Sequence, residues 1–310
     1  MLIVYLTKKS MKHILSIMIF CVALQSLAQN YFDVVNLTYI NTPSNDFEFS
    51  NGDTAVEELN LELNFPIILN KKTILLTGFY ANKTIVRLDA SATNSDLQFL
   101  GLNLGINKTF NDTWSATFMA YAKIASDKLK LTSDNFQLGF LSLFTKKKRA
   151  DLKYKYGVFL NNEKFGLAVI PIFGLYYLST NKKFEANLTL PIIADINYKL
   201  NKRLWTGFRF DGIGTTYNLS DQNYSNNGAY ASKSSIEFTS YLRFKINKSL
   251  YFNTKVGYAF NRNYRVYETD DKIDLAVTSL YFGDSRTQLN ENFADGAIFK
   301  IELLYRLHFD

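Results

Sequence analysis

The stretch 56–66, VEELNLELNFP, alternates strictly between apolar and polar side chains. Its apolar positions are Leu59, Leu61, Leu63 and Phe65, and the polar positions between them are Glu58, Asn60, Glu62 and Asn64. A period of two is the period of a β-strand, so this segment has one apolar and one polar face. The apolar face must contact either the core of a soluble β-sandwich or lipid.

The same alternation recurs to the end of the chain, and no segment has a sustained helical period. It predicts about fourteen strands, with twelve as an alternative, and residues 184–200 are either two strands around Pro191 or one bent strand. The predicted strands are roughly 31–40, 56–67, 73–82, 97–106, 114–125, 135–144, 151–160, 165–178, 184–190, 192–200, 203–218, 234–246, 250–261 and 297–309.

The composition agrees with an all-β fold. Aromatic residues make up 15% of the chain, with 26 Phe and 20 Tyr, and there are only 4 Pro. Aromatic side chains suit a pleated surface, whereas proline interrupts a strand ladder. The apolar share of 47% excludes a disordered chain.

Residues 1–28 have the pattern of a secretory signal peptide. Lys12 precedes an apolar run of eleven residues at 14–24, and the small residues Ser26 and Ala28 follow at the −3 and −1 positions of a cleavage site. We expect cleavage after Ala28, with Met11 as an alternative start. The mature chain, residues 29–310, then forms a single domain.

Removal of this segment changes both the thiol content and the charge. The single cysteine, Cys21, lies within the apolar run, so the mature chain forms no disulfide. Three of the 35 basic residues are lost, which leaves 32 against 28 acidic residues, a net charge of +4. This mild charge does not suggest a nucleic-acid partner.

The predicted connections alternate between short and long. Five short ones contain an Asn-Lys pair, at 70–71, 107–108, 181–182, 201–202 and 247–248, and Asn tolerates the backbone of tight hairpin turns. Long connections are expected at 41–55, 83–96, 126–134, 219–233 and 262–296. Short turns at one end and long loops at the other are typical of a closed antiparallel transmembrane β-barrel, with periplasmic turns and extracellular loops. The apolar stretch 275–282 should fold over the mouth or pair as a strand extension.

Over residues 29–310 the pattern resembles the outer-membrane β-barrels of Gram-negative bacteria. The end of the chain, 299–310, is similar to the terminal strand that the barrel-assembly machinery recognises, with Tyr305, Leu307 and Phe309 on its apolar face. The segments 154–177 and 188–208 resemble a family of outer-membrane barrels of unknown function. The resemblance implies an outer-membrane location, with lipid and the assembly machinery as partners, and it implies no activity.

A catalytic or metal-binding group is not expected. The mature chain has one histidine, His308, on the last predicted strand and away from the rim where barrel enzymes usually place their sites. The acidic loop residues Glu268, Asp270, Asp271 and Asp274 lack the spacing of a calcium loop. We therefore expect no metal or cofactor, and enzymatic activity remains a minor alternative.

The polar strand faces supply the candidate site, which is the lumen. Ten basic and six acidic side chains are expected to point inward, and such mixed charges either pair with one another or line water. They are Glu58, Glu62, Lys123, Lys153, Lys155, Asp195, Lys199, Arg209, Asp211, Glu237, Arg243, Lys245, Lys255, Lys300, Glu302 and Arg306. The favoured function is a passive pore for small solutes. The alternative is a closed barrel that serves as a structural, adhesive or partner-binding protein.

Overall fold

The computed structural model describes residues 31–220 and 224–308. The predicted signal peptide, its cleavage site at Ala28 and Phe309, which was expected on the apolar face of the last strand, lie outside the described residues. No helix in the described ranges is both long and apolar enough to span a bilayer.

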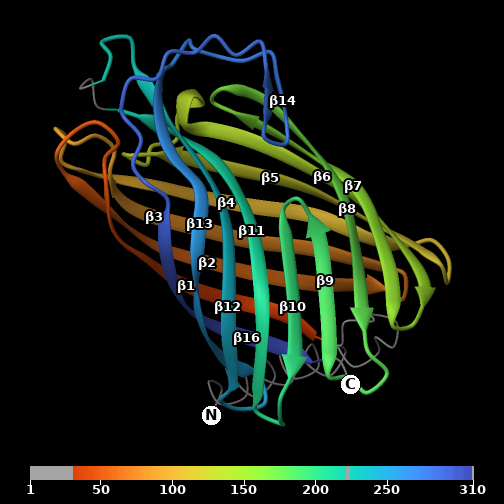
Figure 1. Cartoon of the computed structure of the whole chain (residues 1–310). Coiled ribbons are helices and arrows are strands. Elements are labelled where there is room, and N and C mark those ends of the chain that lie inside the picture. The colour runs from red at the N-terminus through yellow and green to blue at the C-terminus, as the bar shows by residue number, and fades with distance from the viewer. Residues whose placement is uncertain (1–30, 221–223, 309–310) are drawn as a thin grey trace, which may run out of the picture.

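Fourteen strands form a closed antiparallel barrel (Figure 1), as the alternation predicts. They are β1 (Tyr31–Asp46), β2 (Asp53–Asn70), β3 (Thr73–Arg87), β4 (Asn94–Thr109), β5 (Trp114–Ser126), β6 (Phe136–Arg149), β7 (Leu152–Glu163), β8 (Gly166–Leu178), β9 (Phe184–Leu190), β10 (Ile193–Lys199), β11 (Leu204–Leu219), β12 (Ala229–Lys245), β13 (Leu250–Glu268) and β16 (Gly296–His308). Pairing of β1 with β16 closes the ring. A short 3₁₀-helix, η2 (Ser133–Asn135), precedes β6.

Strand β2 shows how the wall is built and which surface its apolar face contacts. Leu59 and Phe65 are 49% and 48% exposed on the outside of the barrel, whereas Asn60 and Glu62 border the space inside it. An apolar outer surface around a closed hydrogen-bonded wall is what a bilayer requires, because no backbone group is left unpaired in hydrocarbon.

Several strands run further than the sequence predicts. The expected loop 41–55 shrinks to 47–52, and the expected loop 83–96 shrinks to 88–93. Asn107 and Lys108 lie within β4, so the prediction of a turn there is wrong, and the chain turns at 110–113 instead. The ladders continue beyond the apolar band, where the side-chain alternation that marks a lipid-facing strand no longer holds.

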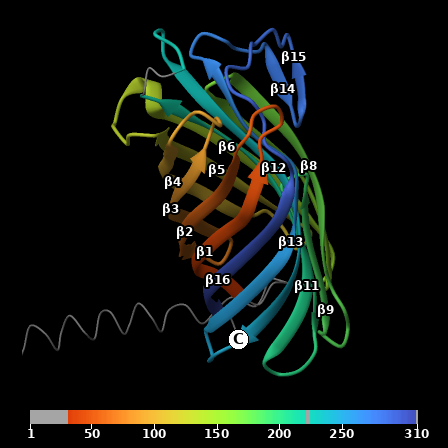
Figure 2. The ribbon, with the colours of Figure 1, turned by 60° about the vertical axis from the view of Figure 1, so that its left-hand side comes forward.

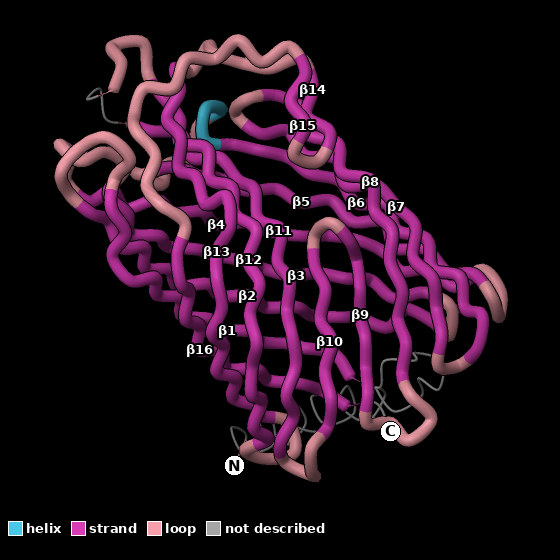
Figure 3. The backbone as a smooth tube through the Cα atoms, viewed as in Figure 1, coloured by secondary structure: helices cyan, strands magenta, loops and turns pink. Residues whose placement is uncertain are grey.

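The region around Pro191 forms two strands rather than one bent strand. β9 and β10 have seven residues each, and the chain turns between them at 191–192. A strand needs about 9–11 residues to cross a bilayer. Figures 1 and 3 show that this hairpin ends about halfway up the wall, between β8 and β11.

A small hairpin covers part of the end that carries the long loops. It consists of β14 (Leu275–Val277) and β15 (Leu280–Phe282), and it lies beside the mouth of the barrel in Figure 2. β14 pairs in parallel with β8 at Ala168 and Val169. The apolar stretch 275–282 therefore extends the sheet at the mouth, as its composition predicts.

The two walls of the barrel pack against each other at this long-loop end. Val86 on β3, Leu97 on β4, Tyr217 on β11 and Val266 on β13 belong to one fully buried apolar cluster. Ser126 at the end of β5 also forms a parallel bridge to β11. The upper barrel is thus closed by side chains over β2–β5 and β11–β13.

Candidate functional site: the lumen

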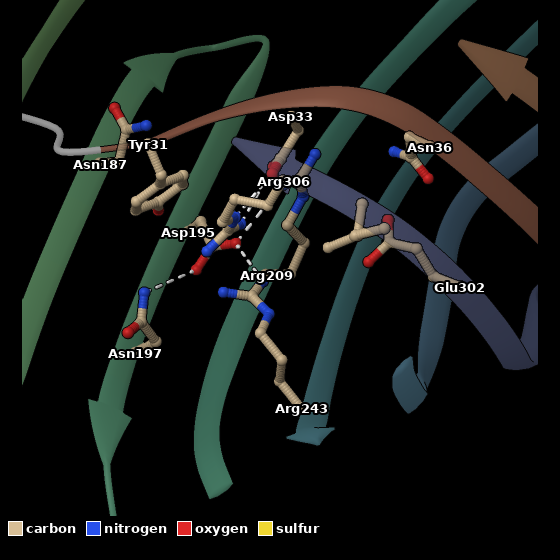
Figure 4. Close-up of a pocket in the computed structure, with 11 residues that line it drawn as sticks. Tyr31, Asp33, Asn36, Asn187, Asp195, Asn197, Arg209, Arg243, Glu302 and Arg306 are labelled. Carbon is tan, nitrogen blue, oxygen red and sulfur yellow. Dashed lines mark hydrogen bonds and ion pairs between the residues drawn. The ribbon is translucent and has the colours of Figure 1, made fainter. Parts of the chain in front are cut away.

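The barrel encloses a cavity of about 1250 Å³. Inward side chains of most of the wall strands border it, and they include tyrosine, asparagine and both signs of charge. A second pocket of about 100 Å³ lies toward the short-turn end (Figure 4). The large cavity exceeds the roughly 300–1,000 Å³ of a typical small-molecule pocket, so it has room for a small solute.

The structure places the sixteen predicted inward charges in three groups. The first group borders the large cavity: Glu58, Glu62, Lys123, Arg209, Asp211, Lys255, Lys300 and Glu302. The second group borders the small pocket: Asp195, Arg243 and Arg306. Arg209 and Glu302 of the first group border this pocket as well. The third borders neither space: Lys153, Lys155, Lys199, Glu237 and Lys245.

Lys300 is the centre of a buried charge network on β10, β11, β12 and β16. Its Nζ lies 2.5 Å from a carboxylate oxygen of Glu237 and 3.3 Å from one of Asp211. Arg209 bridges Asp211, at 2.8 Å, and Asp195, at 3.5 Å. These charges satisfy one another, which is the condition under which buried ions are tolerated.

A second part of the network joins β12, β13 and β16. Lys255 lies 3.1 Å from Glu302, and Asn253 donates a hydrogen bond to the same carboxylate. Arg243 donates from Nε to the side-chain oxygen of Asn253 at 3.1 Å, and a second nitrogen of its guanidinium lies 3.5 Å from Asp195. The inward basic charges on β12, β13 and β16 are therefore largely neutralised.

A hydrogen bond between opposite walls crosses the short-turn end of the lumen. The Tyr31 hydroxyl on β1 donates to Glu185 on β9 at 3.3 Å. Arg306 stacks on the Tyr31 ring, 3.5 Å from its centre, and pairs with Asp33 at 2.6 Å. The contact between Tyr31 and Glu185 narrows the lumen near the seam where β1 pairs with β16.

Two ion pairs lie toward the long-loop end. Lys233 lies 2.6 Å from Glu58, which also accepts a hydrogen bond from the Tyr264 hydroxyl at 3.2 Å. Lys123 lies 3.1 Å from Glu163. Both carboxylates are buried, at 5% and 6% exposure, so each needs its lysine to offset the cost of burying a negative charge.

Four of these partners are absent from the predicted inward charges: Asp33, Glu163, Glu185 and Lys233. Glu163 and Lys233 lie just beyond the predicted ends of their strands, at 160 and 234. Asp33 lies beside a register shift between Asp33 and Val35, so simple alternation gives it the wrong face. Glu185 lies within the predicted strand 184–190, where alternation could have found it. Three of the four are acidic, so they reduce the excess of inward basic charge.

Besides Glu237, which pairs with Lys300, three of the predicted charges that border neither space have local partners. Lys155 donates to Asn187 at 2.6 Å and to Thr189 at 3.1 Å. Lys199 lies over the ring of Trp205 and Lys245 over that of Tyr251, at 5.4 and 5.6 Å from the ring centres.

The described residues contain no group of three or more His, Cys, Asp or Glu side chains placed to hold a metal ion. His308 lies within hydrogen-bond distance of the Tyr251 hydroxyl, at 2.9 Å. Glu268 accepts a hydrogen bond from Ser225 at 2.9 Å, at the edge of the long-loop region.

Residues 24–301 match the family described as Domain of unknown function (DUF6268). The chain belongs to the DUF6268 family. No curated protein matches this DUF6268 chain.

Solved β-barrels resemble the DUF6268 chain only distantly. The toluene transporter TodX of Pseudomonas putida is 10% identical, with a TM-score of 0.39 and coverage of 93% of this chain and 90% of that one. The KdgM porin, in complex with disordered oligogalacturonate, is 9% identical, with a TM-score of 0.37 and coverage of 88% and 99%. The translocator domain of the autotransporter NalP from Neisseria meningitidis is 7% identical, with a TM-score of 0.35 and coverage of 97% and 96%. At these scores the function must be argued from the chain's own geometry.

Proposed function

We propose that the protein is an outer-membrane channel for small solutes that is closed at rest. The observation that carries this proposal is the cavity of about 1250 Å³ inside a barrel whose outer surface is apolar. A barrel built only for structure can fill its interior with side chains, as small barrels do. Here paired charges line the walls and leave room between them.

The outer membrane is the compartment that fits both the barrel and the predicted signal peptide. Lipid would contact the outward apolar band, and the assembly machinery would contact the last strand. The passing solute is expected to be uncharged or of mixed charge, because most of the inward ions are already paired. The mild anion preference suggested by the basic majority is therefore expected to be weak.

The closed state follows from the two ends of the lumen. At one end the apolar cluster around Tyr217 and Val266 joins the walls. At the other, Tyr31 reaches Glu185 across the lumen. Opening requires the side chains of both contacts to move, because the strand ladders themselves cannot separate without losing hydrogen bonds.

Planar-bilayer recordings of refolded protein test the proposal. The expected result is brief openings of small conductance, with a reversal potential close to zero in a salt gradient. Folding is checked separately by the shift in gel mobility on heating that intact barrels show. A correctly folded protein that never conducts, even when the contacts over its mouth are removed by mutation, would overturn the proposal.

A closed structural barrel is the second candidate, and the contact between Tyr31 and Glu185 favours it. If the bridge is permanent, Tyr31→Phe should lower the thermal stability and leave the protein silent in bilayers. In a gated channel the same change should raise the frequency of opening. The two measurements on one variant therefore separate the candidates.

A further inference from the structure

The short β9–β10 hairpin interrupts the barrel wall. The last pair between β8 and β9 is Phe173 with Leu190, and the last pair between β10 and β11 is Ile193 with Asp211. Beyond these pairs, toward the long-loop end, β8 and β11 continue without a barrel strand between them. Figures 1 and 3 show the space above the hairpin tip, with β8 on one side and β11 on the other.

This space is framed on four sides, and we call it the side window. Its lower edge is the hairpin tip at 191–192, and its upper edge is the β14–β15 turn at 278–279. Its sides are the segment 170–172 of β8 and the segment 212–214 of β11. The residues of this frame that border the large cavity are Ile170, Pro191, Ile192, Gly212, Ile213, Gly214, Thr278 and Ser279.

The large cavity extends to the side window. Residues on all four sides of the frame border it, among them Ile170 of β8, Ile192 of the hairpin tip, Ile213 of β11 and Ser279 of the β14–β15 turn. Ile236 of β12, beside the window, borders it as well. The lumen is therefore continuous with the space inside the frame.

The window lies at the level of the lipid-facing band. Gly212 pairs with Ile236, which in turn pairs with Phe260 on β13. Ile236 and Phe260 are outward and 36% and 46% exposed, as the lipid-facing residues of the neighbouring strands are. The opening therefore faces the bilayer rather than water.

Some backbone groups at and beside the window are satisfied without a further strand. On β11 the Gly212 amide donates to the Ile192 carbonyl at 2.8 Å, and just above the window the Thr216 amide donates to the Glu163 carboxylate at 2.8 Å. On β8, next to the window, the carbonyl of Val169 accepts from the Thr278 amide at 3.0 Å. An unpaired strand edge in hydrocarbon is costly, and these contacts lower the cost of the opening.

The chemistry of the frame indicates what passes. Ile170, Ile192 and Ile213 make three sides apolar, and Gly214 leaves open space, since a Cβ added there would meet nothing within 4 Å. Leu280 and Phe282 of the upper edge are 63% and 52% exposed. Charged solutes would lose their hydration at such a rim, whereas an apolar molecule would not.

We propose that the side window is a lateral portal through which a small lipid-soluble molecule passes between the lumen and the membrane. This proposal rests on the proposed function of the lumen as a passage, and it names the substrate class and the route. The β14–β15 hairpin forms the upper edge of the portal.

Fluorescence quenching in vesicles tests the portal. The mature chain lacks cysteine, so Asn103→Cys places a single NBD label in the lumen on β4, on the wall opposite the window. A lipid-soluble nitroxide is then added to the membrane, and iodide is added to the water. We expect strong quenching by the nitroxide and weaker quenching by iodide.

Two variants obstruct the portal in different ways. Gly214→Phe fills the window, and Ile192→Arg places a charge on the hairpin tip. Each should slow quenching by the nitroxide several-fold. Ala81→Phe is the matched control, because it adds the same ring to the lipid face of the opposite wall between Leu61 and Leu100. It should have no effect.

The outcomes separate the portal from the channel. Nitroxide quenching that is unchanged in both obstructing variants would overturn the portal and leave ion conductance, and so the proposed channel, intact. A lumen that neither quencher reaches would overturn the portal, and the bilayer recordings would then decide the channel separately. Slowed quenching in either correctly folded obstructing variant, with normal quenching in Ala81→Phe, supports the portal.

Discussion

The guanidinium group of Arg286 lies over the ring of Tyr267, with its central carbon 4.3 Å from the ring centre. Arg286 follows the β14–β15 hairpin, whereas Tyr267 lies at the end of β13. The same group lies 5.1 Å from the ring centre of Tyr281 on β15 and donates a hydrogen bond to Asp284 at 2.9 Å. Its side chain is only 3% exposed. Arg286 thus holds the hairpin against the barrel wall.

Replacing Arg286 should release this hairpin. Each cation–π contact contributes about 0.5–2 kcal/mol, so Arg286→Ala should expose the segment 275–282 to protease in proteoliposomes and lengthen the openings in bilayers. Arg149→Ala is the control, since its exposed pair with Asp151 lies at the other end of the barrel. If both variants behave like wild type, Arg286 does not hold the hairpin.

The hairpin should also loosen in acid. The hydrogen bond from Arg286 lowers the pKa of Asp284 below its ordinary value of 3.8, against a smaller opposing effect of burial. A carboxylate with a lowered pKa stabilises the folded state above its unfolded pKa, and this contribution is lost as the pH falls through the folded value.

We therefore expect protection of 275–282 to be constant from neutral pH to about pH 5 and to fall below about pH 4. Digestion with an acid-active protease measures it. In Asp284→Asn the pH dependence should flatten. An equally steep loss of protection in that variant would assign the effect to another group.

Lys300 should be the most sensitive of the inward charges. Lys300→Met leaves Glu237 and Asp211 without their shared cation in a buried site, which typically costs about 3–5 kcal/mol. Lys83→Met, which breaks a half-exposed pair with Asp96, should cost less than about 1 kcal/mol. Urea unfolding in lipid vesicles measures both. Adding Glu237→Gln to Lys300→Met should recover part of the loss, and equal costs for the two single changes would contradict the network.

The two faces of β4 should respond differently to charge. Leu104 is 59% exposed on the outer face, and its neighbour Asn103 borders the lumen cavity. Leu104→Arg should destabilise the barrel by about 2–4 kcal/mol if it lies near the bilayer midplane, because arginine must leave water there. Asn103→Arg should cost clearly less in the same unfolding assay. A larger cost for Asn103→Arg than for Leu104→Arg would contradict the assignment of the outer face of β4 to lipid.

Orientation in the membrane can be tested with cysteines at the two ends. Ser285, in the loop after β15, and Lys248, in the turn between β12 and β13, are both exposed. An impermeant thiol reagent on intact cells should label Ser285→Cys and leave Lys248→Cys unlabelled. Labelling of Lys248→Cys alone would invert the predicted orientation.

The strand period predicts the wall well and the loops poorly. Leu59 and Asn60 point where alternation places them, because lipid on one side and water on the other impose a period of two. Glu163 and Lys233 were missed because their strands continue past the apolar band, where alternation no longer marks a strand. Asp33 was missed because a local register shift changes its face, and nothing in the sequence marks that shift.

The site itself depends on distant pairs that no local pattern contains. The charges of Lys300 and Glu237 are separated by 63 positions, and those of Lys233 and Glu58 by 175. Alternation shows that such residues point inward, but the choice of partner is set by strand order and register. The pattern does predict a short strand at 184–190, which is β9, but it does not show that the hairpin leaves a gap in the wall, because that depends on its neighbours β8 and β11.

The seam between β1 and β16 sets the order in which such a barrel can be made. Asp33 and Arg306, which pair across it, are 273 positions apart, so all of the chain between them must be made before they meet. Until then β1 has an unpaired edge that hydrocarbon would not tolerate. The edge of the first strand must therefore stay out of hydrocarbon until the last strand arrives to pair with it.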